Sequence, residues 1–288
     1  MPHPRSGLSF HLSQRRCLII VRTVHIPYEA GDVFTLLPIG DIHLGNKTCD
    51  VTKLKRNLES VTDKTLIVGL GDWLDSIIIK DEKRYRKSLD DSETESVIDE
   101  QINRCAEIFA PYSKNILGLG DGNHEENIIS RCGTNPVKRL SEKLSTPEHT
   151  IIYLGYSWLL QLALRQKDGA GRKVIIRGHH GWGNASRTEG ADITKYSHDT
   201  KFWAADIFLY GHTHKLKSND VEEGRVTGEE SWQTFQKKMV VCGTYQRTYT
   251  NNTTATYAER MGLPPVSVRN PIIFIKPIRL GTEITVQH

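Results

Sequence analysis

Five short motifs combine histidine, aspartate or asparagine with glycine or a short turn, and each follows an apolar run. Along the chain they are "DIH" at 41–43, "GDWLD" at 71–75, "GNHE" at 122–125, "HHG" at 179–181 and "GHTH" at 211–214. Each apolar run has the length and composition of a buried β-strand. Because open α/β sheets bind ligands at the carboxyl ends of their strands, we expect the five motifs to meet at one edge.

The motifs together supply nitrogen and oxygen donors. Carboxylate, imidazole and amide oxygen suit a divalent ion such as Mn²⁺, Fe or Zn²⁺, and the set lacks the thiolates of a structural zinc site. The expected ligands are Asp41, His43, Asp72, Asn123, one of His179 and His180, His212 and His214. One tetrahedral ion would use about four of them, whereas two ions that share a carboxylate would use all. The residue types therefore predict a dinuclear site, of a kind that can clamp a phosphoryl group and generate a hydroxide nucleophile at neutral pH.

His124 is not needed as a ligand in this count. We expect it to donate a proton to a leaving oxygen or to stabilise developing charge. Taken singly, each motif also has an ordinary structural explanation: Asp72 could cap a helix, and "GNHE" could be a plain turn. The metal interpretation depends on the five motifs occurring in succession.

The ordered series "GDIH", "GDWLD", "GNHE", "HHG" and "GHTH", from Gly40 to His214, resembles that of the calcineurin-like metallophosphoesterase superfamily. The resemblance implies an α/β fold in which two packed mixed β-sheets are flanked by helices, with a dinuclear site between strand ends. It also implies a metal-dependent phosphoester hydrolase, in which a metal-held hydroxide attacks phosphorus.

The resemblance further implies a role for each matching residue. Asp41 and His43 would bind the first metal, Asp72 would bridge both, Asn123 and His212 would bind the second, and His214 would return to the first. His180 is the expected ligand of the fourth motif because the family's ligand usually precedes glycine, so that His179 becomes a neighbour or a substrate contact. His124 resembles the family's acid or transition-state histidine. Glu125 or Asp75 would orient neighbouring ligands.

The expected substrate is a phosphodiester of a nucleic acid, DNA or RNA, or of a nucleotide. "DIHLG" resembles the first motif of the family's nuclease branch, and the formal net charge of +4 is compatible with a phosphate-bearing partner. The alternatives are a phosphomonoesterase, including a protein phosphatase, a hydrolase of a nucleotide-sugar lipid, and a non-catalytic binding scaffold. The expected cofactors are two divalent ions, Mn²⁺ first, with Fe, Zn²⁺, Ni²⁺ and Mg²⁺ as alternatives.

Four further residues are predicted to contact substrate: His179, Arg187, Tyr245 and Arg247. Arg187 follows a run of small residues after "HHG", and a guanidinium matches phosphate oxygens. Tyr245 and Arg247 follow the apolar run "KMVVC", where an aromatic ring beside an arginine could stack a base and hold a phosphate. Trp73, within "GDWLD", is interpreted as a core residue.

The segments around the motifs alternate between strand and helix in the first half, and strands dominate the second. Helices are predicted over 50–63 and 91–112, with more helical turns from about 131 to 144, and strands over 17–28, 33–40, 65–72, 115–122, 150–165, 173–178, 206–211, 238–245, 270–279 and 282–286. This pattern predicts a layered α/β protein with one or two central sheets. The polar stretch 218–236 is interpreted as a surface insertion, and 249–262 as a loop with a short helix.

The composition is that of a folded globular protein, with 38% hydrophobic and 25% charged residues. We expect a flexible tail over 1–16 and a single catalytic domain over 17–288. The five cysteines are scattered and never form a C-x-x-C pair, which argues against a disulfide framework and favours a reducing, cytoplasmic compartment. No apolar run approaches the ~20 residues of a membrane span. The oligomeric state stays open.

Overall fold

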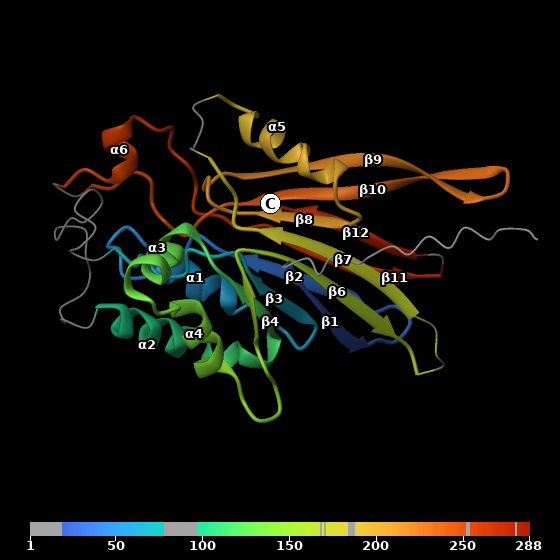
Figure 1. Ribbon diagram of the computed structural model, residues 1–288, viewed down its shortest axis with the longest axis horizontal. Helices are drawn as coiled ribbons and strands as arrows, with labels where there is room; N and C mark the ends of the chain where they lie inside the picture. The colour runs from blue at the N-terminus through green and yellow to red at the C-terminus, as the bar shows by residue number, and fades with distance from the viewer. Residues whose placement is uncertain are drawn as a thin grey trace, which may run out of the picture.

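Two six-stranded β-sheets form the centre of the molecule, with helices outside them (Figure 1). The structure is a computed structural model that describes residues 19–77, 97–167, 169, 171–183, 188–251, 254–279 and 281–288. The tail predicted over 1–16 lies outside this range. Sheet A has the strand order β1-β6-β7-β8-β10-β9, and sheet B has the order β12-β11-β2-β3-β4-β5.

Both sheets mix parallel and antiparallel neighbours. Sheet A consists of β1 (Ile20–Pro27), β6 (Ser157–Arg165), β7 (Gly171–His179), β8 (Ile207–Tyr210), β9 (Leu216–Gly228) and β10 (Ser231–Cys242). Sheet B consists of β2 (Phe34–Ile39), β3 (Thr65–Gly69), β4 (Ile116–Gly120), β5 (Ile152–Gly155), β11 (Ile272–Ile278) and β12 (Gly281–Gln287). Strands β2 to β5 run parallel, as do β7, β8 and β10. The predicted fold class, two mixed sheets flanked by helices, is confirmed.

The helices lie outside the two sheets (Figure 1). They are α1 (Val51–Leu58), α2 (Val97–Phe109), α3 (Asn123–Cys132), α4 (Pro136–Leu144), α5 (Ala191–Ser197) and α6 (Tyr257–Met261), with short 3-10 turns η1 (Ala110–Asn115) and η2 (Asp199–Lys201). Helix α1 begins at Val51 because the Asp50 carboxylate accepts a hydrogen bond from the Lys53 N–H at 2.9 Å. In the described part of the chain, no helix is both long and apolar enough to cross a membrane.

The apolar side chains form three layers between these elements. Between the sheets, Leu36 and Val68 of sheet B belong to the same buried cluster as Leu160 and Ile207 of sheet A. A second cluster joins sheet B to α1, α2 and α4, and a third joins α5 to the outer face of sheet A. Each fully buried large aliphatic side chain contributes about 1.5–3 kcal/mol. Trp73 is fully buried and packs edge-on against Phe109, as the sequence predicts.

The structure divides one segment that the sequence shows as continuous. The predicted strand 150–165 is two strands, because Gly155, at φ +70°, turns the chain from β5 in sheet B to β6 in sheet A. The helical turns predicted from about 131 to 144 correspond to α4, and a separate helix, α3, precedes them and ends where Gly133, at φ +67°, makes a left-handed turn. The part of the predicted helix 91–112 before Val97 lies outside the described residues.

The segment 218–236 is predicted from the sequence to be a surface insertion, and the structure corrects this prediction. It forms most of a long hairpin in which β9 pairs antiparallel with β10 across the two residues Glu229 and Glu230. The hairpin extends beyond the rest of sheet A (Figure 1). Most of its residues are exposed on both faces, so an apolar alternation is missing from its sequence. The short helix expected within 249–262 is present as α6.

Candidate metal centre

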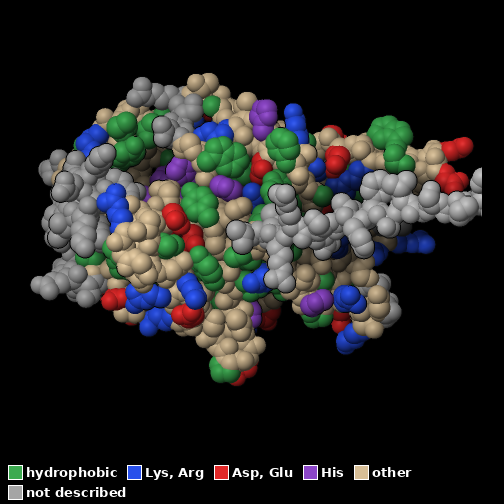
Figure 2. All heavy atoms as spheres, in the orientation of Figure 1, with side chains coloured by type: hydrophobic (Ala, Val, Ile, Leu, Met, Phe, Trp, Pro, Cys, Tyr) green, Lys and Arg blue, Asp and Glu red, His purple; other side chains and the backbone are tan. Residues whose placement is uncertain are grey.

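The five motifs lie at the carboxyl ends of five strands, three from sheet B and two from sheet A. In sheet B, β2 leads into Asp41 and His43, β3 into Asp72, and β4 into Asn123; in sheet A, β7 leads into His180, and β8 into His212 and His214. Histidine side chains appear as neighbouring purple spheres in the left half of Figure 2. Both sheets therefore supply donors to one site.

The backbone at this site adopts an unusual conformation. Six non-glycine residues of the described chain have positive φ, and five are predicted ligands: Asp41 (49°), His43 (52°), Asp72 (50°), His212 (72°) and His214 (61°). A non-glycine residue in the left-handed region is uncommon and costs of order 1 kcal/mol or more. Such strain persists where surrounding contacts fix it, and it gathers at functional sites.

Two glycines allow the strand ends to approach one another. A Cβ added to Gly122 would lie 2.1 Å from the Asp72 Oδ1 atom, and one added to Gly211 would lie 2.7 Å from the Asp41 Oδ2 atom. Both distances are shorter than real Cβ contacts allow. Glycine is therefore required at 122 and 211 for the carboxylates to keep their positions.

One half of the site is formed by Asp41, His43 and His214. The His43 Nε2 and His214 Nε2 atoms are 3.1 Å apart, and Asp41 Oδ1 lies 3.5 Å from His214 Nε2 and 4.0 Å from His43 Nε2. The Asp41 carboxylate also accepts the His212 backbone N–H, at 2.8 Å to Oδ2. Two imidazole nitrogens and one carboxylate oxygen thus face a common point.

The other half is formed around Asn123. Its Oδ1 atom lies 2.9 Å from His180 Nε2 and 2.8 Å from His212 Nδ1. Asp72 stands between the halves, with its Oδ2 atom 3.4 Å from His180 Nε2 and 3.7 Å from His43 Nε2. The Asp72 Oδ2 atom thus lies within 4 Å of an imidazole nitrogen from each half.

The donors fit divalent cations. Three sets of three donors each have ligand atoms within 4.8 Å of one another: Asp41 with His43 and His214, His43 with Asp72 and His124, and Asp41 with Asp72 and His180. Apart from His124 and His214, their members are buried, and His43 Nδ1 has no hydrogen-bond partner. Buried carboxylates and imidazoles in this density are typical of a site with a positive charge at its centre.

The hydrogen bonds of His180 and His212 leave one nitrogen of each ring directed toward the other donors. The ring Nδ1 of His180 donates to the Leu70 carbonyl at 2.8 Å, which leaves Nε2 free to accept or to ligate. The ring Nε2 of His212 donates to the Gly183 carbonyl at 2.5 Å, which leaves Nδ1 facing Asn123. A backbone carbonyl partner of this kind fixes the orientation of a metal-binding histidine.

The electrostatics couple Asp72 to His180. Burial opposes the charge on Asp72, but His180 and His124 outweigh it and hold the pKa of the Asp72 carboxyl well below its usual range. Burial likewise opposes charge on His180, but Asp72 outweighs it and raises the pKa of His180 to about 10. Burial lowers the pKa of His43 well below its usual value, and His124 adds to the effect. A cation at this place would take over the charge that the His180 proton supplies.

Glu125 is hydrogen-bonded to the backbone of the two segments that carry Asp72 and Asn123. Its carboxylate is fully buried and accepts three backbone N–H groups, from Asp72 at 2.9 Å, Leu74 at 3.0 Å and Gly122 at 3.0 Å. Burial, together with the nearby Asp72, raises the pKa of Glu125 to about 8. This side chain therefore fixes the start of α3 to the turn that presents Asp72.

His124 lies at the rim of the site. Its backbone N–H donates to Asp72 Oδ1 at 3.0 Å, and its ring Nδ1 donates to the Asp75 carbonyl. The ring meets that of His43 edge-on, with centroids 4.6 Å apart. Asp75 is buried and accepts a hydrogen bond from Asn46 at 3.1 Å. The fixed Nδ1 leaves the Nε2 of His124 available to a bound substrate.

The predicted substrate contacts have different surroundings. His179 turns away from the ligands and meets Tyr156 and Trp182 edge-on, so that His180 and not His179 joins the cluster. Tyr245 is fully buried, with its hydroxyl accepting from Asn57 at 3.1 Å, and offers no ring to a substrate, contrary to the expectation.

The two predicted arginines also differ. Arg247 is exposed and pairs with Asp50 at 2.8 Å. Arg187 lies outside the described residues. Sequence reasoning did not single out Trp182, which lies two positions after His180. The feature that could have indicated it is an aromatic residue between two glycines, Gly181 and Gly183.

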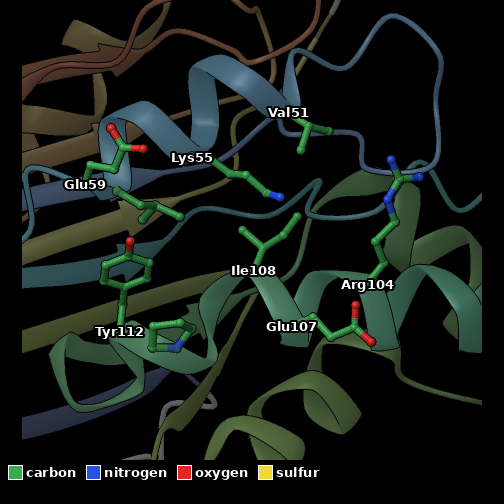
Figure 3. A pocket seen from close by; sticks show the side chains of 9 residues that line it. Val51, Lys55, Glu59, Arg104, Glu107, Ile108 and Tyr112 are labelled. Carbon is green, nitrogen blue, oxygen red and sulfur yellow. The ribbon is translucent and has the colours of Figure 1, made fainter.

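A separate pocket of about 470 Å³ lies between α1, α2 and η1 (Figure 3). It is lined by Val51, Lys55, Leu58, Glu59, Arg104, Glu107, Ile108, Pro111 and Tyr112. Figure 3 shows Lys55 and Arg104 reaching into it from opposite helices. None of the five motifs contributes to its lining, so it is distinct from the metal centre.

A scan of protein-family models and a search of curated proteins found no match. The search of solved structures found several neighbours. A Vps29 from Chaetomium thermophilum is 11% identical at a TM-score of 0.37, with 88% of this chain and 96% of that chain covered. A metallophosphoesterase from Sphaerobacter thermophilus is 12% identical at 0.35, with 89% of each chain covered. The NAD nucleotidase of Haemophilus influenzae is 12% identical at 0.39, with 89% of this chain and 50% of that chain covered.

All of these TM-scores lie below 0.5, so the functional proposal has to rest on the side chains of the site. Two of the neighbours are described as phosphoesterases. The two mixed sheets and the convergence of the motifs are observed directly in this chain. In the order of its five motifs, the chain resembles the calcineurin-like metallophosphoesterases.

Proposed function

We propose that this chain is a calcineurin-like metallophosphoesterase: a single catalytic domain that uses two divalent metal ions to hydrolyse phosphoesters. The observation that carries the proposal is the position of Asp72. Its carboxylate lies between a set made of Asp41, His43 and His214 and a set made of Asn123, His180 and His212. A single carboxylate between two donor sets is what two neighbouring cations require.

Each part of the chain has a definite task in this proposal. Two bound divalent ions, Mn²⁺ first among them, lower the pKa of water and offset negative charge on a phosphoryl group. Asp72 holds the two donor sets together, and Glu125 fixes the turn that carries Asp72. His124, with Nδ1 engaged by the Asp75 carbonyl, directs Nε2 toward the leaving oxygen and supplies its proton.

We further propose a phosphodiester of a nucleic acid or nucleotide as the substrate. The "DIHLG" motif and the net charge of +4 favour this class. A phosphomonoesterase and a nucleotide-sugar-lipid hydrolase remain the enzyme alternatives, because a metal centre alone does not select a substrate. The non-catalytic scaffold is disfavoured by the seven predicted ligands, all of which are present. The scattered cysteines favour a reducing, cytoplasmic compartment.

A metal analysis joined to a matched pair of substrates tests the proposal. Protein loaded with Mn²⁺ is analysed for bound metal and assayed on bis(p-nitrophenyl) phosphate, on p-nitrophenyl phosphate, and on single- and double-stranded DNA and RNA oligonucleotides. We expect two ions per chain and faster hydrolysis of the bis-ester than of the mono-ester. Asp41→Asn should lower both metal content and activity, whereas Asp63→Asn, at an exposed carboxylate paired with Lys114, should change neither.

The outcomes separate the alternatives. A preference for the mono-ester would replace the phosphodiesterase by a phosphomonoesterase. Two bound ions without hydrolysis of any ester would favour the scaffold. No bound metal at saturating Mn²⁺, Zn²⁺ and Fe²⁺ would contradict the proposal as a whole.

A further inference from the structure

Beside the metal centre, the aromatic ring of Trp182 is held rigidly and is partly open to solvent. Trp182 is 37% exposed, although it follows the predicted ligand His180 by only two residues. Its indole meets three rings edge-on: His179 at a centroid distance of 5.0 Å and 81°, Tyr196 at 4.8 Å and 85°, and Tyr210 at 5.7 Å and 86°. Among the described residues, no ring is stacked parallel on the indole.

The rings behind Trp182 form a fixed support. Tyr196 on α5 and Tyr210 at the end of β8 are both fully buried and stack on each other at 4.3 Å with an angle of 2°. They belong to the cluster that packs α5 on sheet A. The indole therefore rests on buried side chains of the core.

The backbone on both sides of Trp182 is tied to the metal centre. The Gly183 carbonyl accepts from the ring of His212, and the Gly181 carbonyl accepts from the Tyr156 hydroxyl at 3.4 Å. The Tyr156 ring in turn meets both His179 and His180 edge-on. Trp182 thus lies in a segment whose neighbouring residues contact His212 and, through Tyr156, His180.

We propose that Trp182 is a specificity-determining platform on which the base of a nucleoside phosphoester stacks while the phosphate lies at the metal centre. The inference rests on the proposed function and names the part of the substrate that the metal ions do not hold. A flat, rigid, partly exposed indole is suited to a π-face, and each stacked base is worth a substantial part of the binding free energy. The buried Tyr245, which the sequence suggested for this task, cannot perform it.

The test compares two esters with the same leaving group and the same charge. Thymidine 5′-(p-nitrophenyl) phosphate carries a base, whereas methyl p-nitrophenyl phosphate carries none. We expect the wild-type protein with Mn²⁺ to prefer the thymidine ester, and Trp182→Leu to lower that preference in kcat/KM by about 5- to 100-fold, mainly through KM. Leucine keeps the apolar contact with Tyr196 and Tyr210 but has no π-face, and Trp182→Phe should keep part of the preference.

The matched control is Trp232→Leu, which removes a more exposed tryptophan (69%) from the β9–β10 hairpin and should leave the preference intact. Phenyl p-nitrophenyl phosphate distinguishes a base from any flat ring; if its hydrolysis depends on Trp182 as strongly as that of the thymidine ester, the nucleoside assignment is wrong. The platform itself is overturned if Trp182→Leu keeps the full preference for the thymidine ester.

A binding measurement separates failure of the platform from failure of the proposed function. Calorimetric titration of thymidine 5′-monophosphate into the Mn²⁺-loaded protein should show weaker binding to Trp182→Leu than to the wild type, with inorganic phosphate bound equally by both. If the wild type hydrolyses neither ester but this difference in binding remains, the hydrolase proposal fails and the platform stands. If both esters are hydrolysed and the difference is missing, the platform fails and the hydrolase stands.

Discussion

At His124, two hydrogen bonds fix the residue before any substrate is bound. The backbone N–H is held by Asp72 and the ring Nδ1 by the Asp75 carbonyl, so one ring nitrogen is left to act. The ring also lies within the donor set of His43 and Asp72, which would suit a ligand as well. The two roles predict different behaviour in a variant.

Replacing His124 with alanine separates acid from ligand. We expect His124→Ala to lower kcat by about 10²- to 10⁴-fold, because a positioned proton donor contributes that much, while the metal content measured by mass spectrometry stays at two ions. His25→Ala, on the exposed surface of β1, is the matched control. A loss of metal in His124→Ala would show that the ring is a ligand and that the assigned role is wrong.

Asp72 should affect both ions together. Asp72→Asn replaces a shared anion by a neutral amide whose NH₂ group faces His43 or His180, so we expect the bound metal to fall from two ions toward none. The comparison is Asp41→Asn. Asp41 is a donor of the set with His43 and His214, so this variant should keep the ion held by Asn123, His180 and His212. A titration of metal into each variant, monitored by calorimetry, would distinguish these cases. If Asp72→Asn still bound one ion tightly, the bridging role would be contradicted.

Sequence reasoning predicted which side chains would come together, because each proposed ligand follows an apolar run and a glycine. It left His179 and His180 open, because adjacent residues of a strand point to opposite faces and the sequence does not say which face meets the other sheet. It misjudged Tyr245, because a tyrosine is compatible with both a surface and a core position. Only the packing of α1, which brings Asn57 to the Tyr245 hydroxyl, shows that this tyrosine is in the core.

At the scale of elements, the turn after β3 and the start of α3 behave as one unit. The Glu125 carboxylate binds three backbone N–H groups from these two segments. Sheet geometry alone would not place Asp72 so close to Gly122. Glu125 therefore has a structural task that its sequence neighbour Glu126 does not share.

Glu125→Gln is expected to destabilise this unit. A glutamine side chain has one acceptor oxygen in place of two, and its NH₂ group would face a backbone N–H, so we expect the free energy of unfolding to fall by about 1–3 kcal/mol. Urea unfolding monitored by circular dichroism measures the change. Glu126→Gln, at an exposed position one residue away, should be neutral. Equal stability of Glu125→Gln and the wild type would show that the three hydrogen bonds contribute little.

The β9–β10 hairpin shows why an element can be hidden in a sequence. Apolar alternation arises only where one face of a strand meets a core, and most of this hairpin does not. Its pairs are polar instead: Arg225 lies over the ring of Phe235 at 4.7 Å, and Glu223 pairs with Lys237 at 3.2 Å. A segment held by such cross-strand pairs is indistinguishable from a polar loop when periodicity is the only signal.

At the scale of the whole molecule, the candidate metal ligands come from both sheets. Sheet B supplies Asp41, His43, Asp72 and Asn123, and sheet A supplies His180, His212 and His214. A cation bound by both sets of residues adds a connection between sheets that otherwise meet through their apolar layer. Stability should therefore depend on metal.

Removal of the ions tests this dependence. We expect chelation to lower the unfolding temperature, and Mn²⁺ to restore it, because an ion at a hundred times its Kd stabilises the folded state by about 2.7 kcal/mol. Differential scanning calorimetry with and without chelator gives the shift. The Asp72→Asn variant should show little response to Mn²⁺. An unchanged transition in the wild type would argue against bound ions joining the sheets.

The spacing of the ligands along the chain also sets the order of events during synthesis. His43 and His214, whose Nε2 atoms lie 3.1 Å apart, are separated by 171 positions. The polypeptide must therefore be synthesised past β8 before the donors Asp41, His43 and His214 can come together. An ion that binds all three, as we propose, can join the protein only after that point in synthesis.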